Sequence, residues 1–227
     1  MTIHILVEGP SERVLLEKWS SRLAMGQPVR LHPHQGKGSL PDDVSAVVAK
    51  HRRGLLDQLP AKLRGFSSSL DPNDDSVVVL VDADDEDVPS LRARISAAIE
   101  QVAPSMRVLV RIAVEETEAF YLGDLRALKA AFPAADMARA RAYQPDSICG
   151  TWELFGSIVG DGGGNKVAWA EEMAPVLTTK ANESRSPSFR DLLLGLRELA
   201  AARKAPAKRR AKYRHPSRNR PDTSGKR

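Results

Sequence analysis

Three short apolar segments, each followed directly by acidic residues, restrict the possible folds of this chain more than any other feature. They cover residues 2–7 (TIHILV), 76–81 (SVVVLV) and 107–114 (RVLVRIAV). Each segment is short and rich in β-branched residues, as buried strands are. The unbroken Val/Leu run of 76–81 is typical of a strand covered on both faces, as in a parallel sheet.

Helical patterns alternate with these segments along the first half of the chain. The spacing of apolar residues predicts helices from Ser11, over 42–65 with a break near Gly54 and Pro60, and after Pro89, with a possible further strand over 28–34. Strands that alternate with helices are connected most simply as a parallel sheet with helices on its faces. We therefore expect an α/β fold with a mainly parallel sheet flanked by helices.

Composition and charge divide the chain into three parts. We expect an α/β domain over 1–123, a helical C-terminal subdomain packed on it over 124–202, and a disordered basic tail over 203–227. The tail has eleven Lys or Arg residues and one acidic residue, whereas residues 1–202 have 23 basic and 28 acidic residues. The net charge of +5 therefore describes an acidic body with a basic tail. In the second part, helical patterns cover 124–132, 151–159, 166–177 and 188–202.

Several classes of protein are excluded by composition. A hydrophobic content of 42% is too high for a chain that is disordered throughout. No apolar run reaches the ~18–20 residues of a membrane-spanning helix, and the first residues lack the pattern of a signal peptide. The single cysteine excludes an intramolecular disulfide framework. We expect a cytoplasmic protein that does not enter a membrane.

Acidic side chains lie at the end of each of the three predicted strands. They are Glu8, then Asp82 and Asp84, then Glu115, Glu116 and Glu118. Because parallel strands end at the same edge of a sheet, we expect the three groups to converge there. Converging carboxylates repel one another and raise one another's pKa. A hard divalent cation relieves this repulsion, and oxygen ligands favour Mg²⁺ or Mn²⁺. If residues 82–84 continue the strand, Asp82 and Asp84 point the same way.

Each acidic group also has a purely structural interpretation. Residues 82–88 can form a solvated turn whose acids favour the N-terminus of the next helix. Glu8 can simply precede a turn from strand to helix, and the three later glutamates can occupy a first helical turn. The sequence alone leaves both interpretations open.

Two of the strand ends resemble a known pair of motifs. A strand ending in Glu8-Gly9 and a later strand ending in Asp82-Ala83-Asp84 are similar to the signature motifs of the TOPRIM domain. That domain occurs in topoisomerases, in primases and in nucleases of the overcoming-lysogenization-defect class. Further segments, residues 35–38, 55–65, 114–124 and 184–189, resemble a bacterial TOPRIM-like family of unknown function that is related to abortive-infection proteins. The resemblance covers about residues 1–200.

The resemblance implies a function and a role for individual residues. The glutamate matching Glu8 acts as general acid or base or helps to bind metal, and the aspartates matching Asp82 and Asp84 bind Mg²⁺. Glu116 and Glu118 match a second metal site of the nuclease branch. The chain departs from the family pattern at Asp85 and near Val88, which affects the ligand pattern after Asp84. It also has Phe120 where a tryptophan is more common. Members are often encoded beside an AAA-type ATPase, which implies such a partner.

Basic residues are needed to hold the phosphates of a nucleic acid. Lys37 lies in a Gly-Lys-Gly loop, and Lys166 follows a glycine-rich loop and can begin a helix. Each basic residue can equally be an ordinary surface residue. The candidate catalytic residues are Glu8 and Lys166; the candidate metal ligands are Glu8, Asp82, Asp84, Glu116 and Glu118; the candidate residues for binding phosphate or nucleic acid are Lys37, Arg185, Lys208, Arg209 and Arg210.

The function expected from these residues is that of a Mg²⁺- or Mn²⁺-dependent nuclease acting on DNA or RNA, in phage defence. The alternative is an effector or regulator that binds a partner ATPase or nucleic acid without hydrolysis. A haloacid-dehalogenase-type phosphatase also has a strand ending in Asp-x-Asp, but it leaves Glu8 unexplained. Topoisomerase and primase activities are disfavoured, because the chain is short and has no cysteine-rich zinc module.

Overall fold

The computed structural model describes residues 2–23, 26–147, 150–162 and 164–201. The basic tail, with Lys208, Arg209 and Arg210, lies outside the described residues. Its expected disorder and the expected role of these three residues therefore stay predictions. Within the described part of the chain, no helix is both long and apolar enough to cross a membrane.

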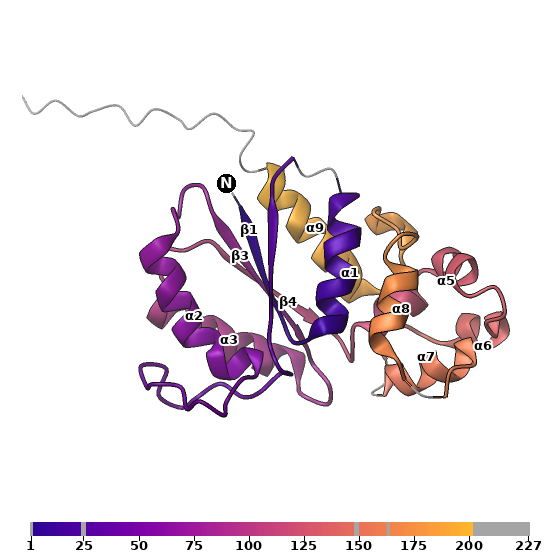
Figure 1. Ribbon diagram of the computed structural model, residues 1–227, viewed down its shortest axis with the longest axis horizontal. Coiled ribbons are helices and arrows are strands. Elements are labelled where there is room, and N and C mark those ends of the chain that lie inside the picture. Colours follow the sequence, from indigo (N-terminus) through magenta and orange to yellow (C-terminus); the bar gives the residue numbers. More distant parts are fainter. Residues whose placement is uncertain (1, 24–25, 148–149, 163, 202–227) are drawn as a thin grey trace, which may run out of the picture.

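Four parallel strands form the central sheet, in the order β2-β1-β3-β4 (Figure 1). The strands are β1 (Ile3–Val7), β2 (Val29–Pro33), β3 (Ser76–Asp82) and β4 (Val108–Ala113). Ile3 pairs with both Val29 and Ser76, and Asp82 pairs with Ala113. This arrangement confirms the expected α/β class and places β1, β3 and β4, the three strands followed by acids, side by side.

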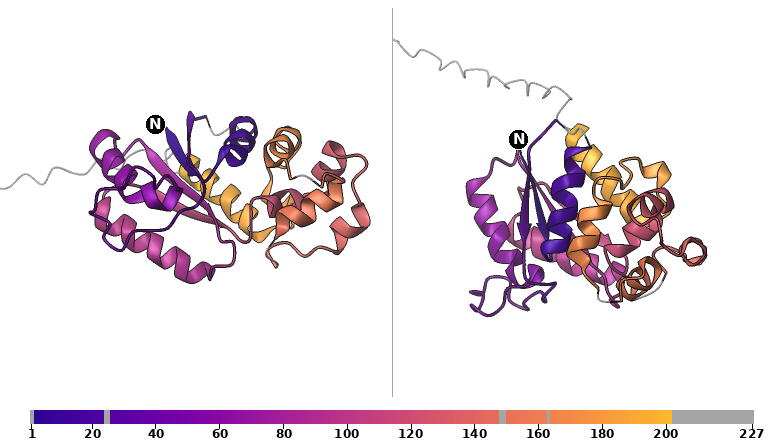
Figure 2. Two further views of the ribbon diagram at one scale, coloured as in Figure 1. Left: turned by 60° about the horizontal axis from the view of Figure 1, so that its bottom comes forward. Right: turned by 45° about the vertical axis from the view of Figure 1, so that its right-hand side comes forward.

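Helices cover both faces of the sheet (Figures 1 and 2). They are α1 (Pro10–Ser21), α2 (Leu55–Ser69), α3 (Val88–Val102), α4 (Glu118–Gly123), α5 (Leu125–Ala131), α6 (Met137–Ala142), α7 (Thr151–Val159), α8 (Lys166–Met173) and α9 (Pro187–Ala201), with a short 3-10 turn, η1 (Ala181–Glu183). α2 and α3 pack on one face, while α1 and α9 pack on the other, with α4 to α8 beyond them.

Alternate residues of the buried strands supply the two halves of the core. Val77, Val79 and Val81 of β3 face α2 and α3, whereas Val78 and Leu80 face the larger cluster. That larger cluster runs without a break from β1 and α1 into the helices after residue 124. One hydrophobic core therefore spans the expected domain boundary at residue 123. The division of the chain into two domains at that residue stays a prediction.

The helix expected over 42–65 begins only at Leu55, so the prediction for 42–54 is wrong. Gly54 is the N-cap of α2, and its N–H donates to the Asp57 carboxylate at 3.1 Å. The next two N–H groups, of Leu55 and Leu56, donate to the carbonyls of Gly36 and Lys37 at 2.8 and 2.7 Å. The Gly36–Gly38 loop therefore satisfies the N–H groups left free at the start of a helix.

Candidate functional site

The side chains of the candidate site gather at the C-terminal edge of the sheet. Glu8 follows β1, Asp82 ends β3, and Glu118 begins α4 just after β4. The backbone N–H of Asp82 donates to Glu8 Oε1 at 2.8 Å, across 74 residues of sequence. The strand order therefore brings together residues that are far apart in the chain, as the sequence predicts.

The carboxylate of Asp82 is buried at this edge, and burial changes its protonation. Burial is the main cause that raises its pKa well above the usual value, and the charges of Glu8, Glu12 and Glu118 raise it further. Lys166 acts in the opposite direction. The hydroxyl of Thr117 donates to Asp82 Oδ1 at 3.1 Å and fixes the orientation of the carboxylate.

Glu8 and Glu118 are shifted in the same way. Burial raises the pKa of Glu8 to about 7, with a smaller opposing effect from the Asp82 N–H. Burial also raises the pKa of Glu118 to about 7, although Lys166 favours its charged form. Both groups therefore exchange a proton near neutral pH, where a general acid or base is most effective.

Lys166 begins α8, as the sequence predicts, and contacts two glutamates at this edge. Its Nζ lies 3.3 Å from Glu116 Oε1 and 3.6 Å from Glu118 Oε2, and 5.5 Å from the ring centre of Trp152. Burial disfavours the ammonium, but Glu118, Glu116 and Asp82 outweigh this effect and raise its pKa. Lys166 therefore stays charged and offsets part of the negative charge.

Glu12 belongs to this group, although the sequence analysis did not select it. It lies in the first turn of α1, is 7% exposed, and accepts a hydrogen bond from the Ser11 hydroxyl at 2.8 Å. The sequence offered one signal for including Glu12, which is its position four residues after Glu8, across a turn from strand to helix. Its burial comes from tertiary packing and could not be read from that spacing.

Glu115 and Glu116 have other partners, in the helical region. Glu115 Oε2 accepts hydrogen bonds from the Tyr143 hydroxyl, at 2.6 Å, and from Thr151. Glu116 Oε2 accepts from the N–H of Trp152 in the first turn of α7, at 2.8 Å. These two residues connect the end of β4 to α7 and to the residue after α6, which fits the structural interpretation of an acid at a helix start.

Asp84 does not continue the extended strand, so the condition under which it would share a face with Asp82 is not met. Its φ of +52° is left-handed, and its side chain is 46% exposed, whereas Asp82 is 9% exposed. Lys37 Nζ lies 3.1 Å from Asp84 Oδ2 and 2.8 Å from Glu86 Oε1, and donates to the Ala83 carbonyl. Asp87 caps α3 by accepting from the Ser90 N–H.

Two predicted phosphate-binding residues are thus engaged within the protein. Lys37 is only 12% exposed and bridges its loop to the acidic turn after β3. Arg185 donates to the carbonyls of Ala140, Arg141 and Tyr143 at the end of α6, at 3.4, 3.4 and 2.6 Å. Within the described residues, both side chains serve as internal connections.

The residues at this edge fit a hard divalent cation in their chemistry. Glu8, Asp82 and Glu118 offer only oxygen atoms, and their raised pKa values reflect burial together with unbalanced negative charge. No three Asp, Glu, His or Cys side chains of the described residues are close enough to hold one ion. The carboxylates are therefore gathered without forming a closed coordination shell.

The model of a protein family described as "Domain of unknown function (DUF4276)" matches residues 7–197. The chain belongs to the DUF4276 family. No curated protein and no solved structure matches the chain significantly. The matched region of the DUF4276 domain includes every residue of the acidic edge from Glu8 to Lys166, and it excludes the basic tail.

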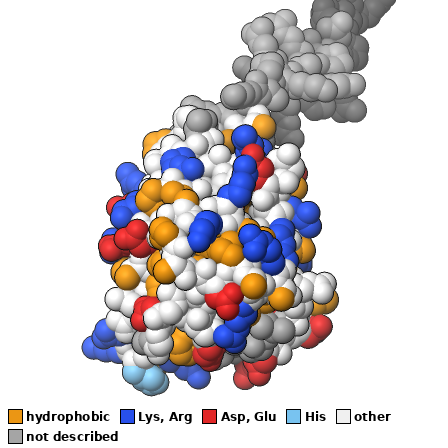
Figure 3. Space-filling model, turned by 90° about the vertical axis from the view of Figure 1, so that its right-hand side faces the viewer, with side chains coloured by type: hydrophobic (Ala, Val, Ile, Leu, Met, Phe, Trp, Pro, Cys, Tyr) orange, Lys and Arg blue, Asp and Glu red, His pale blue; other side chains and the backbone are white. Residues whose placement is uncertain are grey.

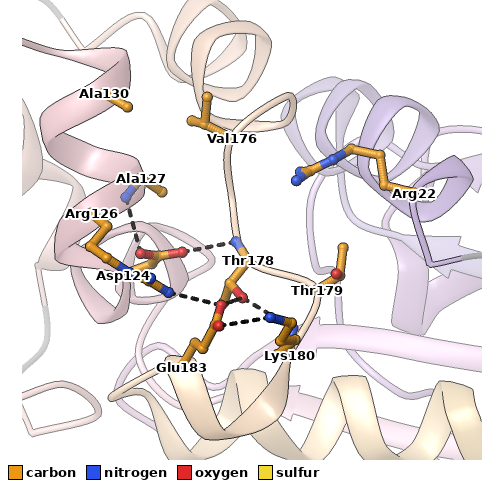
Figure 4. A pocket seen from close by; sticks show the side chains of 10 residues that line it. All are labelled: Arg22, Asp124, Arg126, Ala127, Ala130, Val176, Thr178, Thr179, Lys180 and Glu183. Carbon is orange, nitrogen blue, oxygen red and sulfur yellow. Dashed lines mark hydrogen bonds and ion pairs between the residues drawn. The ribbon is translucent and has the colours of Figure 1, made fainter.

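Away from the acidic edge, the DUF4276 domain has a hollow of about 400 Å³ at the C-terminal end of α1 (Figure 4). Arg22, which follows α1, donates to the carbonyls of Ala174 and Leu177 at 2.9 and 2.7 Å. Glu183 pairs with Arg126 at 2.8 Å and with Lys180 at 3.1 Å. Each charged side chain of this hollow already has a hydrogen-bond or ion-pair partner within the protein.

Figure 3 draws one face of the molecule, on the side of the helical region. In the face drawn in Figure 3, basic and acidic side chains are interspersed with hydrophobic ones. Within the described part of the DUF4276 domain, the acidic edge of the sheet is therefore the better candidate for a functional site.

Proposed function

We propose that this chain is a Mg²⁺- or Mn²⁺-dependent TOPRIM-type nuclease that hydrolyses phosphodiester bonds in DNA or RNA. The observation that carries the proposal is the convergence of Glu8, Asp82 and Glu118 at the ends of three adjacent parallel strands. All three have pKa values raised mainly by burial, and Lys166 offsets their charge only in part. The positions of the Glu-Gly and Asp-x-Asp motifs at this edge support the TOPRIM assignment.

In this proposal Glu8, Asp82 and Glu118 would hold the metal ion after their side chains move closer together, because no three such groups of the described residues are close enough to hold one ion as they stand. When bound, such an ion stabilises negative charge on the phosphoryl group and activates water as a nucleophile. Thr117 orients Asp82 through its hydrogen bond, which is the usual role of a residue behind a metal ligand. Asp84 stays a predicted ligand, and its pairing with Lys37 must loosen for it to take part.

Glu8 and Lys166 act on the substrate in this proposal. With a pKa of about 7, Glu8 can accept a proton from the attacking water and return one to the leaving oxygen. The ammonium of Lys166 stays charged and attracts the scissile phosphate. Glu116 holds Lys166 in place and at the same time anchors the first turn of α7.

A cleavage assay tests the proposal. The purified protein is incubated with labelled DNA or RNA and with Mg²⁺, Mn²⁺ or EDTA, alongside Asp82→Asn, Glu8→Gln and the control Glu100→Gln on the exposed side of α3. We expect metal-dependent cleavage by the wild type and the control only. Cleavage that persists in both site variants would contradict the proposed site. Mn²⁺ titration calorimetry on the same proteins measures metal binding independently of turnover.

The alternative function is that of an effector or regulator that binds a partner ATPase or nucleic acid without hydrolysis. It is favoured by one observation, the absence of three ligand side chains arranged around a single point among the described residues. Nucleic-acid binding without cleavage, with the partner ATPase present, would support it. A role in phage defence and an AAA-type partner are further parts of the proposal that come from the family resemblance, and a cytoplasmic location is a part that comes from the composition.

A further inference from the structure

We propose that a cavity beside Glu8 binds a backbone phosphate of the nucleic-acid strand, next to the phosphate that is cleaved; this inference rests on the proposed function. The cavity has a volume of about 430 Å³. It lies between the start of α1, the end of β2 and the start of α2, and its lining residues are Pro10, Arg13, Pro33, His34, Gln35, Arg53 and Gln58.

The backbone connects this cavity directly to the acidic edge. The N–H of Gly36 donates to the Glu8 carbonyl at 2.8 Å, and the N–H of His34 donates to the Val7 carbonyl at 3.0 Å. On the other wall, Pro10 and Arg13 belong to the first turn of the helix that follows Glu8. In this proposal, a nucleic-acid strand whose scissile phosphate lies at Glu8 places the neighbouring phosphate at this cavity.

The charge of the cavity suits an anion. Its lining residues, all within the described chain, include two arginines and no carboxylate. This contrasts with the site beside it, where carboxylates outnumber cations. The amide side chain of Gln35 adds hydrogen-bond donors to the wall, whereas the amide nitrogen of Gln58 already donates to the Arg52 carbonyl at 2.6 Å. Guanidinium groups bind phosphate with two parallel hydrogen bonds, which makes arginine well suited to this role.

Both arginines are free to turn toward a ligand. Arg13 contacts Glu17 at 3.7 Å in an exposed pair, and such pairs contribute little stability. Arg53 donates from Nε to the Lys50 carbonyl at 3.3 Å, and within the described residues its Nη atoms have no hydrogen bond. The position of Arg53 is nevertheless fixed, because its carbonyl accepts the N–H of Gln35 at 3.0 Å. Lys37 and Arg185 lack this freedom.

Binding measured in EDTA tests the inference apart from cleavage. The full chain, the variant R13Q/R53Q and the control R126Q/R139Q are titrated into fluorescein-labelled single-stranded DNA and RNA, and anisotropy is followed over a range of salt. The control removes the same charge from exposed positions of α5 and α6, and it keeps the basic tail. We expect R13Q/R53Q alone to weaken binding by about tenfold. Its slope of log K against log salt should fall by about 0.7, the value for one phosphate on a single strand.

The outcomes separate this inference from the proposed function. Equal losses in the two double variants, or no binding by the wild type, would overturn the phosphate site. If the wild type cleaves and R13Q/R53Q cleaves and binds equally well, the nuclease proposal stands and the phosphate site fails. If no protein cleaves but R13Q/R53Q binds less tightly than the control, the phosphate site stands and the nuclease proposal fails. Circular dichroism confirms that both double variants are folded.

Discussion

Two sets of carboxylates lie at the same edge of the sheet, and their charges are balanced in different ways. Asp84 and Glu86 lie on a partly exposed turn and pair with Lys37 and Arg94. Glu8, Asp82 and Glu118 are buried; Lys166 favours the charged forms of Asp82 and Glu118, and Lys37 favours that of Glu8. Hydrogen bonds to Lys37 are the main cause that lowers the pKa of Glu86, whereas burial raises that of Glu8 and Glu118. The comparison teaches that solvation and pairing, more than acidic sequence, distinguish a structural turn from a candidate site.

The largest expected effect comes from one substitution made in each set. Asp82→Asn should lower the rate of metal-dependent cleavage by about 100-fold or more, a size typical of losing one charged contact to the transition state. Asp84→Asn should lower it by less than about tenfold, because Asp84 is already paired with Lys37. The measurement is the initial cleavage rate under saturating Mg²⁺. Equal losses in the two variants would break the comparison.

The next effect is on stability and depends on pH. Glu118 has a folded pKa of about 7, above its ordinary value of 4.5, so the native state holds the proton more tightly. Its stability contribution is therefore present at low pH and lost as pH rises through 4.5–7. Glu118→Gln should raise the free energy of unfolding by about 1–2 kcal/mol at pH 8. Urea denaturation in EDTA should show that this gain disappears near pH 4.5; a gain that does not depend on pH contradicts the assignment.

The two lysines provide a third comparison. Lys166→Met should abolish most cleavage, because its ammonium is the one placed beside Glu118. Lys37→Met removes pairs with the partly exposed Asp84 and Glu86 and should cost less than about 1 kcal/mol of stability. Its cleavage rate should stay within a few-fold of the wild type, as measured with the same substrate. A larger loss of cleavage in Lys37→Met would restore Lys37 as a phosphate-binding residue.

The smallest effect tests burial in a part of the sheet away from the acids. His4 Nδ1 and His32 Nε2 lie 3.0 Å apart, and both rings pack on Phe66. Burial lowers the pKa of His32 from 6.5 to about 4, so the unfolded chain binds the proton more tightly between these values. Stability from His32 should be present above pH 6.5 and lost toward pH 4, by less than about 1 kcal/mol over the whole range, because the ring is only partly buried and solvent screens the shift.

His32→Gln isolates this contribution. The free energy of unfolding of the wild type minus that of the variant should fall between pH 6.5 and 4, while the opposing effects of Glu8 and Glu118 cancel in the difference. A difference that is flat over this range would show that the His32 ring stays solvated. Urea denaturation at closely spaced pH values measures it.

The positions of the buried strands could be predicted, because their residues carry the signal themselves. Segments 2–7, 76–81 and 107–114 correspond to β1, β3 and β4 within one or two residues. The sequence indicated only a break near Gly54 and not the start of α2. That start depends on hydrogen bonds from the N–H groups of Leu55 and Leu56 to the Gly36–Gly38 loop, which lies 18 or more residues earlier in the chain. Val47 had helical spacing but is 97% exposed in an irregular segment.

The acidic site was predictable in outline and not in detail. Strand ends identified Glu8 and Asp82, because parallel topology alone brings them to one edge. The burial of Glu12, the hydrogen bond of Thr117 to Asp82 and the left-handed backbone of Asp84 depend on neighbours in three dimensions. The same applies to Arg13 and Arg53, which are unremarkable in sequence and become a pair only around the cavity beside Glu8.

The long path from Glu8 to Lys166 has a consequence for synthesis of the chain on the ribosome. Every carboxylate of the site emerges before the lysine that offsets it, and α8 then has to dock on α1, where the indole of Trp19 donates to the Thr178 carbonyl across 159 residues. Until that docking, Lys37 can pair with the turn after β3, but the growing chain lacks the cation that favours the charged forms of Asp82 and Glu118. Contacts of such sequence separation form slowly, so the nascent protein acquires this part of its charge balance late in synthesis.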